Sequence, residues 1–165
     1  IYGVIARFAN NVKNPTAADN RVQAVAQKSV DLTVNAVVKN GTGEQKNNAK
    51  SWMVEVDSRR ATSKTGGSAT TYGDKNLTVY YSSIETLATY EAPIKLAGGI
   101  TAQGGSPALV AVGTHELAHT TSENRAIEAS PEKESNASGQ SLRLIKGTPE
   151  AKDVYETTPS AENRQ

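Results

Sequence analysis

One segment constrains the fold of this chain more than any other, because it joins an apolar run to a pair of histidines. Pro107-Ala-Leu-Val-Ala-Val leads across a Gly-Thr pair into His115-Glu-Leu-Ala-His119. Ser106 suits the N-cap and Pro107 suits the first position of a helix, so we expect a helix to begin there. The apolar side chains predict that this helix is buried and that the other elements pack around it.

Histidines four residues apart lie one turn apart on the same face of a helix, so the imidazoles of His115 and His119 can bind one metal ion. Glu116 then lies beside a water molecule on that ion. Zinc lowers the pKa of such a water to about 7, and a neighbouring carboxylate can accept its proton during attack on a peptide carbonyl. The motif therefore predicts Zn²⁺ as the cofactor and Glu116 as the general base.

The two histidines of the motif are the only ones in the chain, which also lacks cysteine. A catalytic zinc ion normally has three protein ligands, so the third must be a carboxylate. Glu123 continues the spacing of the histidines, but it reaches the same ion only if the helix bends at residues 120–122. Glu128 needs the same bend, and Glu150 and Asp153 are more distant alternatives.

Four other residues are candidates for supporting roles in the reaction. Tyr155 is a candidate donor to the oxyanion of a tetrahedral intermediate. Arg125 and Arg143 are candidates for binding a peptide carboxylate, and Thr114 is a candidate for orienting a histidine. The simpler interpretation is that the tyrosine packs in the core and that the arginines lie on helix surfaces.

Length and charge limit the classes of protein to consider. At 165 residues the chain suits a single domain over residues 1–165. A net charge of +1, with both signs interspersed, argues against nucleic acid or a membrane surface as a partner. No apolar run approaches the roughly 20 residues of a membrane span, so we expect a soluble protein. The start at Ile1 leads us to expect a domain released or cut from a longer polypeptide.

The remaining periodicity predicts an α+β domain with a small sheet. Apolar positions favour a helix over the first half of residues 22–40, although alternation from Val30 to Val38 also fits a strand. Residues 52–56 and 77–81 carry the β-branched and aromatic side chains that are typical of strands.

Polar segments connect these elements. The loop-like, turn-rich or simply polar segments are residues 10–20, 41–50, 58–74 and 131–139. A second helix is expected to begin at Glu123, after a Thr-Thr-Ser sequence that can cap it. Residues 157–165 are expected to form a disordered tail.

The order of features from about Leu77 to Tyr155 resembles the zincin-type effector metallopeptidases of bacterial type III effectors and of the toxin ends of Rhs-like polymorphic proteins. In that family a strand similar to Leu-Thr-Val-Tyr-Tyr precedes an apolar helix that ends in His-Glu-Leu-x-His. Glu123-Asn-Arg-Ala-Ile matches the segment that follows, and residues 136–143 match a later one loosely. The resemblance implies Glu123 as the third ligand. Because the family usually has a longer insertion before this glutamate, Glu128 is the alternative.

The same resemblance implies a zincin-like fold, in which a small mixed sheet packs on the helix that carries the motif. It implies zinc-dependent hydrolysis of peptide bonds, a protein or peptide substrate, secretion or delivery into a target cell, and a cognate immunity protein as a partner. A second resemblance is to the aspartate-liganded deuterolysin group, whose Gly-Thr-x-Asp-x-x-Tyr-Gly signature is similar to Gly147-Thr148 with Asp153 and Tyr155. In that case Asp153 binds the metal, although the spacing differs.

We expect an edge strand of the sheet to lie beside the motif helix, where an extended peptide can add as a further strand. Two other functions fit the same residues. In one, the chain is a non-enzymatic binding or toxin domain, and the motif is incidental or holds a structural metal. In the other, the bond that is hydrolysed is a different amide.

Overall fold

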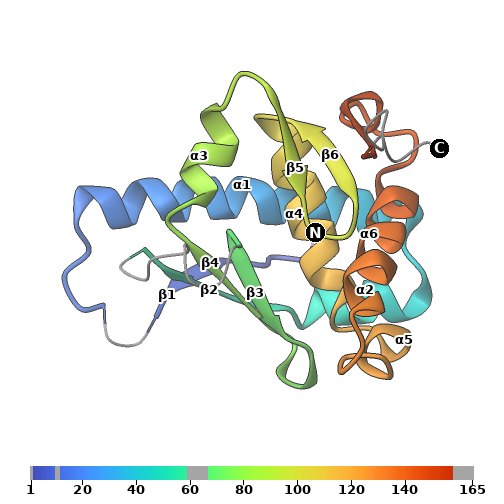
Figure 1. The fold of residues 1–165 in the computed structure, drawn as a ribbon. Coiled ribbons are helices and arrows are strands. Elements are labelled where there is room, and N and C mark those ends of the chain that lie inside the picture. The colour runs from blue at the N-terminus through green and yellow to red at the C-terminus, as the bar shows by residue number, and fades with distance from the viewer. Residues whose placement is uncertain (1, 10–11, 59–66, 158–165) are drawn as a thin grey trace.

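The computed structural model describes residues 2–9, 12–58 and 67–157, which form a mixed α+β structure with two small sheets (Figure 1). The helices are α1 (Ala17–Asn40), α2 (Gly43–Lys50), α3 (Ile84–Thr89), α4 (Ser106–Ala118), α5 (Ser122–Arg125) and α6 (Glu132–Ile145). The strands are β1 (Ala6–Phe8), β2 (Met53–Asp57), β3 (Ala69–Tyr72), β4 (Leu77–Tyr81), β5 (Pro93–Leu96), β6 (Ile100–Gln103) and β7 (Val154–Glu156). The expected α+β class is confirmed.

The strands belong to two separate sheets. The first sheet has the order β1-β2-β4-β3, with β1, β2 and β4 parallel and β3 antiparallel to β4. The second sheet has the order β5-β6-β7, and its strands are antiparallel. The first sheet is therefore small and mixed, and β3 is one of its two edge strands.

Helix α4 lies at the centre of the molecule and packs against both α1 and α6 (Figure 1). Every residue from Ala108 to Ala118 is buried, as expected for a helix that is apolar around most of its circumference. The Ser29 hydroxyl of α1 donates to the Leu109 carbonyl at 2.7 Å and lies 2.8 Å from the Tyr80 hydroxyl of β4. This contact joins α1, α4 and the first sheet in one core.

The helix predicted from residue 22 is longer than its apolar pattern indicates. It begins at Ala17 inside a segment that was expected to be a loop, because Thr16 and Asp19 form a capping box. It continues to Asn40, where the Gly41 amide donates to the Val37 carbonyl. Burial follows the helical period, so the alternative of a strand over its second half is wrong.

Two polar segments that carried no helix prediction are helical. Residues 41–50, expected to be a loop, contain α2, which begins with a capping box between Thr42 and Gln45. Residues 131–139 contain the whole first half of α6. The buried face of α6 includes Ser138 and Gln140, whose polar side chains conceal the helical period from a hydrophobicity pattern.

The strand predictions at residues 52–56 and 77–81 are confirmed within one residue as β2 and β4. Gly105 rather than Ser106 is the N-cap residue of α4, so Ser106 lies one position inside the helix. Within the expected turn-rich segment the structure contains β3, and residues 59–66 of it lie outside the described residues. Of the expected disordered tail, residues 158–165 also lie outside them.

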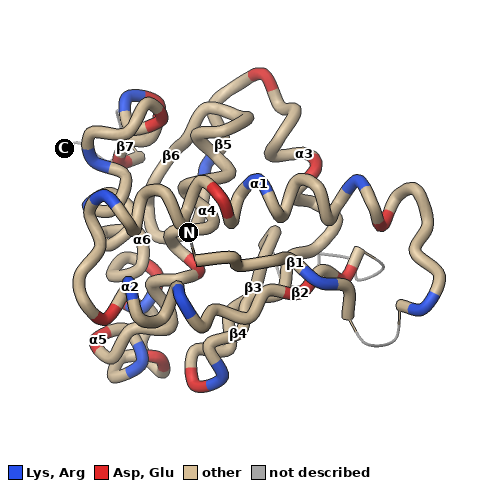
Figure 2. Tube along the Cα trace, turned by 180° about the vertical axis from the view of Figure 1, so that it is seen from behind, with Lys and Arg blue, Asp and Glu red and all other residues tan. Residues whose placement is uncertain are grey.

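Charged residues of both signs are scattered over the described part of the chain, with no extended region of one sign (Figure 2). No helix among the described residues combines the length and the apolar character that a membrane span requires.

The contact between α1 and α4 is tight at Gly113. A Cβ atom at this position would overlap the Thr33 hydroxyl and lie 3.0 Å from the Ser29 carbonyl oxygen. We expect Gly113→Ala to lower the free energy of unfolding by about 1–3 kcal/mol, as overpacking does, in spite of the better helix propensity of alanine. Urea unfolding followed by circular dichroism measures this change.

Gly139 in α6 provides the matched control. A Cβ atom there would meet only the Arg143 guanidinium at 3.6 Å, which is an ordinary contact. Gly139→Ala should therefore leave stability unchanged or raise it by up to about 1 kcal/mol. Equal destabilisation by both substitutions would contradict the tight packing of α1 on α4.

Candidate metal centre

The last turn of α4 presents the side chains of the motif. His115 and Glu116 are buried, with 5% and 8% of their surfaces exposed, and His119 is partly buried at the C-cap position. The helix ends there because the Thr120 and Thr121 hydroxyls donate to the carbonyls of the preceding turn. The chain therefore leaves the helical path after the motif, as a carboxylate ligand from the following segment would need.

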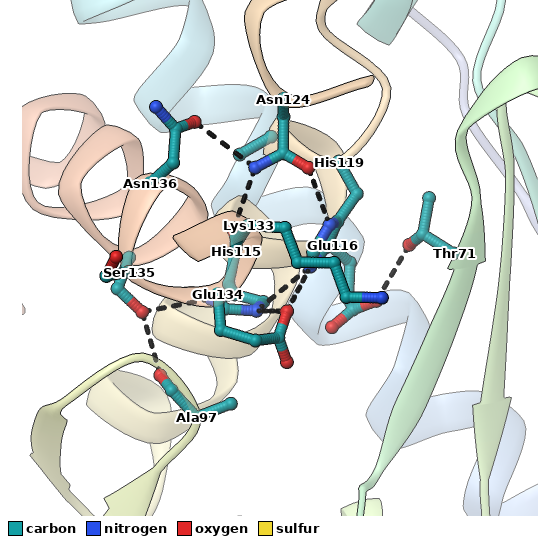
Figure 3. A network of polar contacts seen from close by, with 12 residues as sticks. Thr71, Ala97, His115, Glu116, His119, Asn124, Lys133, Glu134, Ser135 and Asn136 are labelled. Atoms are coloured by element: carbon teal, nitrogen blue, oxygen red, sulfur yellow. Dashed lines mark hydrogen bonds and ion pairs between the residues drawn. The ribbon is translucent and has the colours of Figure 1, made fainter. Parts of the chain in front are cut away.

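After this bend the chain returns through α5 into α6, which packs along α4. The return places Glu134, in the first turn of α6, against both histidines (Figure 3). Glu134 Oε1 lies 2.9 Å from His119 Nε2 and 3.5 Å from His115 Nε2, and the two Nε2 atoms are 3.1 Å apart. Two nitrogens bound tetrahedrally at 2.0–2.1 Å from one zinc ion are about 3.3 Å apart, so the three atoms fit one ion.

The ring of His115 is oriented from its opposite side by Ser138. The Ser138 hydroxyl donates to the Ala97 carbonyl at 2.7 Å, so it accepts from His115 Nδ1 at 3.1 Å. A proton on Nδ1 leaves the Nε2 lone pair for a metal ion, whereas the hydrogen bond from Nε2 to Glu134 forms only when Nε2 also carries a proton. Gly98 allows this contact, because a Cβ atom at its φ of +80° would overlap the Ser138 hydroxyl and the Glu134 carbonyl oxygen.

The ring of His119 is oriented in the same way by Asn124. The Asn124 amide nitrogen donates to the Lys133 carbonyl at 2.8 Å, so its oxygen faces His119 Nδ1 at 2.9 Å and accepts from it. Asn124 also contacts Asn136, which accepts from Gln140. Hydrogen bonds of this kind fix the tautomer and the direction of metal-binding imidazoles in proteins, and here they present both Nε2 lone pairs to one point.

The Glu134 carboxyl and the His119 imidazole shift each other's pKa. Hydrogen bonds with His115 and His119 hold the pKa of the Glu134 carboxyl far below its usual range, so Glu134 is ionised at neutral pH. Burial lowers the pKa of His119, but its hydrogen bond with Glu134 and the charges of Glu116 and Glu134 outweigh burial, and the pKa is raised. A divalent cation would neutralise this concentration of lone pairs and negative charge.

Glu116 lies beside the group of three and differs from it in its surroundings. Burial raises the pKa of Glu116, and the charges of the two histidines and a hydrogen bond from Thr71 offset this only in part. The Thr71 hydroxyl donates to Glu116 Oε1 at 2.7 Å from the edge strand β3. A carboxyl group with a raised pKa beside a metal site suits proton transfer at neutral pH.

All four side chains line a cleft of about 620 Å³. Residues 67–71 and 73, from β3 and its flanks, line one wall, and the β5–β6 hairpin lines the other. Helix α4 contributes Ala111 and Val112 besides the motif, so the cleft combines apolar surface with a few convergent polar groups. This composition is typical of binding sites for organic ligands.

The carboxylates proposed from the sequence as the third ligand are not part of the group. Glu123 is exposed in α5, and its Oε2 accepts from Asn136. Glu128 is exposed and lines the cleft, but its carboxylate is not among the three convergent ligand groups. Glu150 and Asp153 lie at the far end of α6, beyond Ile145, and are likewise outside the group. The carboxylate that the structure places beside the two histidines is Glu134.

The other predicted site residues also lie elsewhere. Tyr155 pairs with Thr101 in the second sheet, is 45% exposed and does not line the cleft. Arg125 and Arg143 are exposed and do not line it either. The Thr114 hydroxyl donates to the Val110 carbonyl within α4, so its role is in helix packing and not in orienting a histidine.

Glu134 does not stand out in the sequence, because it lies fifteen residues after His119 (119 to 134), in a segment without a hydrophobic period. The available signal was a helix start. Ser130-Pro131-Glu132 places a capping hydroxyl and a proline just before acidic residues, and the Ser130 hydroxyl does accept from the Glu132 amide. A helix predicted there would have added Glu134 to the candidate ligands.

Comparisons of the chain with protein-family models, with curated proteins and with solved structures find no match.

Removal of single carboxylates tests the identity of the third ligand. We expect the protein to bind about one zinc ion, and Glu134→Ala to weaken binding by more than about 100-fold, beyond the loss typical of an outer-sphere partner. The control Glu123→Ala removes a nearby exposed carboxylate and should leave the affinity within about threefold. Competition with a chromophoric chelator measures both, and the opposite pattern would restore Glu123 as the ligand.

Acidification should weaken zinc binding, because the metal and the proton compete for the imidazoles. The raised pKa of His119 means that this competition begins at a higher pH than for a free imidazole. Between pH 8 and pH 6 the affinity should fall by up to about tenfold per pH unit for each proton displaced. Calorimetry in buffers of different ionisation enthalpy counts those protons, and an affinity independent of pH over this range would exclude imidazole ligands.

Proposed function

We propose that this chain is a zinc-dependent peptidase domain with a zincin-like fold. The observation that carries the proposal is the convergence of His115 Nε2, His119 Nε2 and Glu134 Oε1 beside the buried Glu116 in one cleft. Structural zinc sites are usually closed by four protein ligands. Three ligands at the floor of a cleft leave a position for water, which supports a catalytic centre over a structural one.

Zinc held by these residues would supply Lewis acidity, which lowers the pKa of a water and polarises a carbonyl. Glu116 accepts a proton from the water as its oxygen attacks the peptide carbon. The same carboxyl group then donates the proton to the amide nitrogen as the C–N bond breaks. Burial of Glu116 favours its protonated form, which helps it hold the proton between the two steps.

The edge of the first sheet provides a place for an extended peptide. β3 pairs with β4 on one side, and residues 67–71 border the cleft on the other. A substrate that adds to this edge gains main-chain hydrogen bonds and lies across the motif helix. We infer that the substrate is a protein segment or peptide in an extended conformation.

A new candidate is needed for the donor to the oxyanion, because Tyr155 lies outside the cleft. Lys133 directly precedes Glu134 on α6, lines the cleft and carries a positive charge. Preorganised cations stabilise developing negative charge in this way. We assign Lys133 the role first given to Tyr155. Delivery into a target cell and an immunity partner stay predictions from the resemblance alone.

Glu116→Gln tests the proposed chemistry, since it removes the proton acceptor and keeps the size of the side chain. Zinc content should stay at about one ion, and turnover of a peptide library analysed by mass spectrometry should fall by about 100-fold or more. Glu128→Gln makes the same change at an exposed position of the cleft wall and should keep most of the activity.

Loss of zinc from Glu116→Gln would show that Glu116 is a ligand and not the base. A zinc-loaded protein that cleaves no member of the library, under conditions in which a known zinc peptidase does, would favour the non-enzymatic alternative.

A further inference from the structure

Glu116 is the end of a line of hydrogen bonds that begins at the buried Trp52, beside the first sheet. The Trp52 indole nitrogen donates to the Thr78 hydroxyl at 3.0 Å. The hydroxyls of Thr78 and Thr71 are 2.8 Å apart, and the Thr71 hydroxyl donates to Glu116 Oε1 at 2.7 Å. Thr71 and Thr78 are directly paired across β3 and β4, so the register of the sheet sets this line.

The direction of every proton in this line is fixed by its two ends. An indole nitrogen can only donate, and an ionised carboxylate can only accept. The Thr78 hydroxyl accepts from Trp52, so its own proton is directed to Thr71. The Thr71 hydroxyl accepts that proton and directs its own to Glu116. Three donations therefore point the same way, toward the carboxylate.

We propose that Thr71, Thr78 and Trp52 are positioning residues that hold Glu116 by Oε1 and leave Oε2 as the oxygen that accepts the proton from water. This inference rests on the proposed function, since it assigns Glu116 as the base. The line extends the site by three residues on the first sheet. None of them belongs to the motif or to the metal ligands.

Burial supports a role beyond filling space. Thr78 is fully buried and Trp52 is 5% exposed, while Thr71 lines the cleft. β-Branched apolar side chains would fill the two threonine positions equally well in a sheet. Polar groups at these positions need partners, and they have each other. Hydrogen bonds in such a chain polarise one another, so the donation to Glu116 is stronger than that of an isolated hydroxyl.

Kinetics of isosteric variants of the zinc-loaded protein test the proposal. Thr71→Val should lower kcat by about 10-fold or more, the effect of losing one hydrogen bond to a charged group, with KM and zinc content little changed. Thr71→Ser keeps the hydroxyl and should restore most of kcat. A kcat of Thr71→Val equal to that of the original protein, or a failure of serine to restore it, would overturn the proposal.

The order of the residues in the line makes a second kinetic test possible. Thr78→Val should lower kcat less than Thr71→Val does, and it should have no further effect once Thr71 is already valine. Additive effects would mean that the two hydroxyls act separately. Thr101→Val is the matched control, since Thr101 is a buried threonine of β6, outside the cleft, whose hydroxyl contacts Thr157. It should leave kcat unchanged.

A spectroscopic measurement decides the same question without any turnover. Trp52 is the only tryptophan of the chain, so its indole N–H gives a single resolved signal in a ¹H–¹⁵N spectrum. Glu116→Gln should shift that signal, and the shift should vanish when Thr71 is valine. Glu128→Gln should leave it in place. An indole signal that does not move in Glu116→Gln would contradict the line of hydrogen bonds from Trp52 to Glu116, even if the protein is a peptidase.

The kinetic and the spectroscopic measurements distinguish a failure of the positioning role from a failure of the proposed function. If no peptide is cleaved but the indole signal shifts in Glu116→Gln only when Thr71 is present, the line of hydrogen bonds is supported and the peptidase assignment is wrong. If Thr71→Val does not fold, the same pair of spectra is recorded with Thr78→Val, which interrupts the line one step farther from Glu116.

Discussion

Helix α6 packs on α4 through small polar side chains, and this contact brings Glu134 beside the two histidines of the candidate metal centre. The Ser141 hydroxyl donates to the Thr114 hydroxyl at 2.6 Å, because the Thr114 proton is already donated to the Val110 carbonyl, and Ser138 contacts His115. Small side chains allow the two helices to approach closely, and each hydroxyl finds a partner across the interface. A larger side chain at Ser138 or Ser141 would separate Glu134 from the histidines.

Neighbouring charges and a hydrogen bond explain why a buried carboxyl group is tolerated in so small a core. Glu116 is the only acidic or basic side chain of α4, if the histidines are set aside, and it is enclosed between the metal centre and the first sheet. An uncompensated carboxylate in such a place is costly. Here the imidazoles on one side and the Thr71 hydroxyl on the other supply the compensation. The first sheet thus contributes to the electrostatics of the site as well as to its shape.

Sequence patterns predicted the elements whose period is unambiguous. The buried motif helix and the strands β2 and β4 were predictable because apolar residues dominate them. Helices α2 and α6 were not, since their buried faces include the polar residues Gln45, Ser138 and Gln140, which hide the hydrophobic period. The pair of histidines was predictable from local spacing. Glu134 was not predictable, because it comes near the histidines only through the packing of α6 on α4.

The close packing at Gly98 links the width of the cleft to the positions of the candidate metal ligands. The turn between β5 and β6 rests so closely on α6 that no side chain fits at Gly98, and the neighbouring Ala97 carbonyl accepts from the hydroxyl that orients His115. The wall formed by this hairpin cannot swing outward without releasing Ser138 and freeing the imidazole ring to rotate. Under the proposed function, a bulky substrate would therefore have to displace the opposite wall, at β3, or fit a cleft of fixed width.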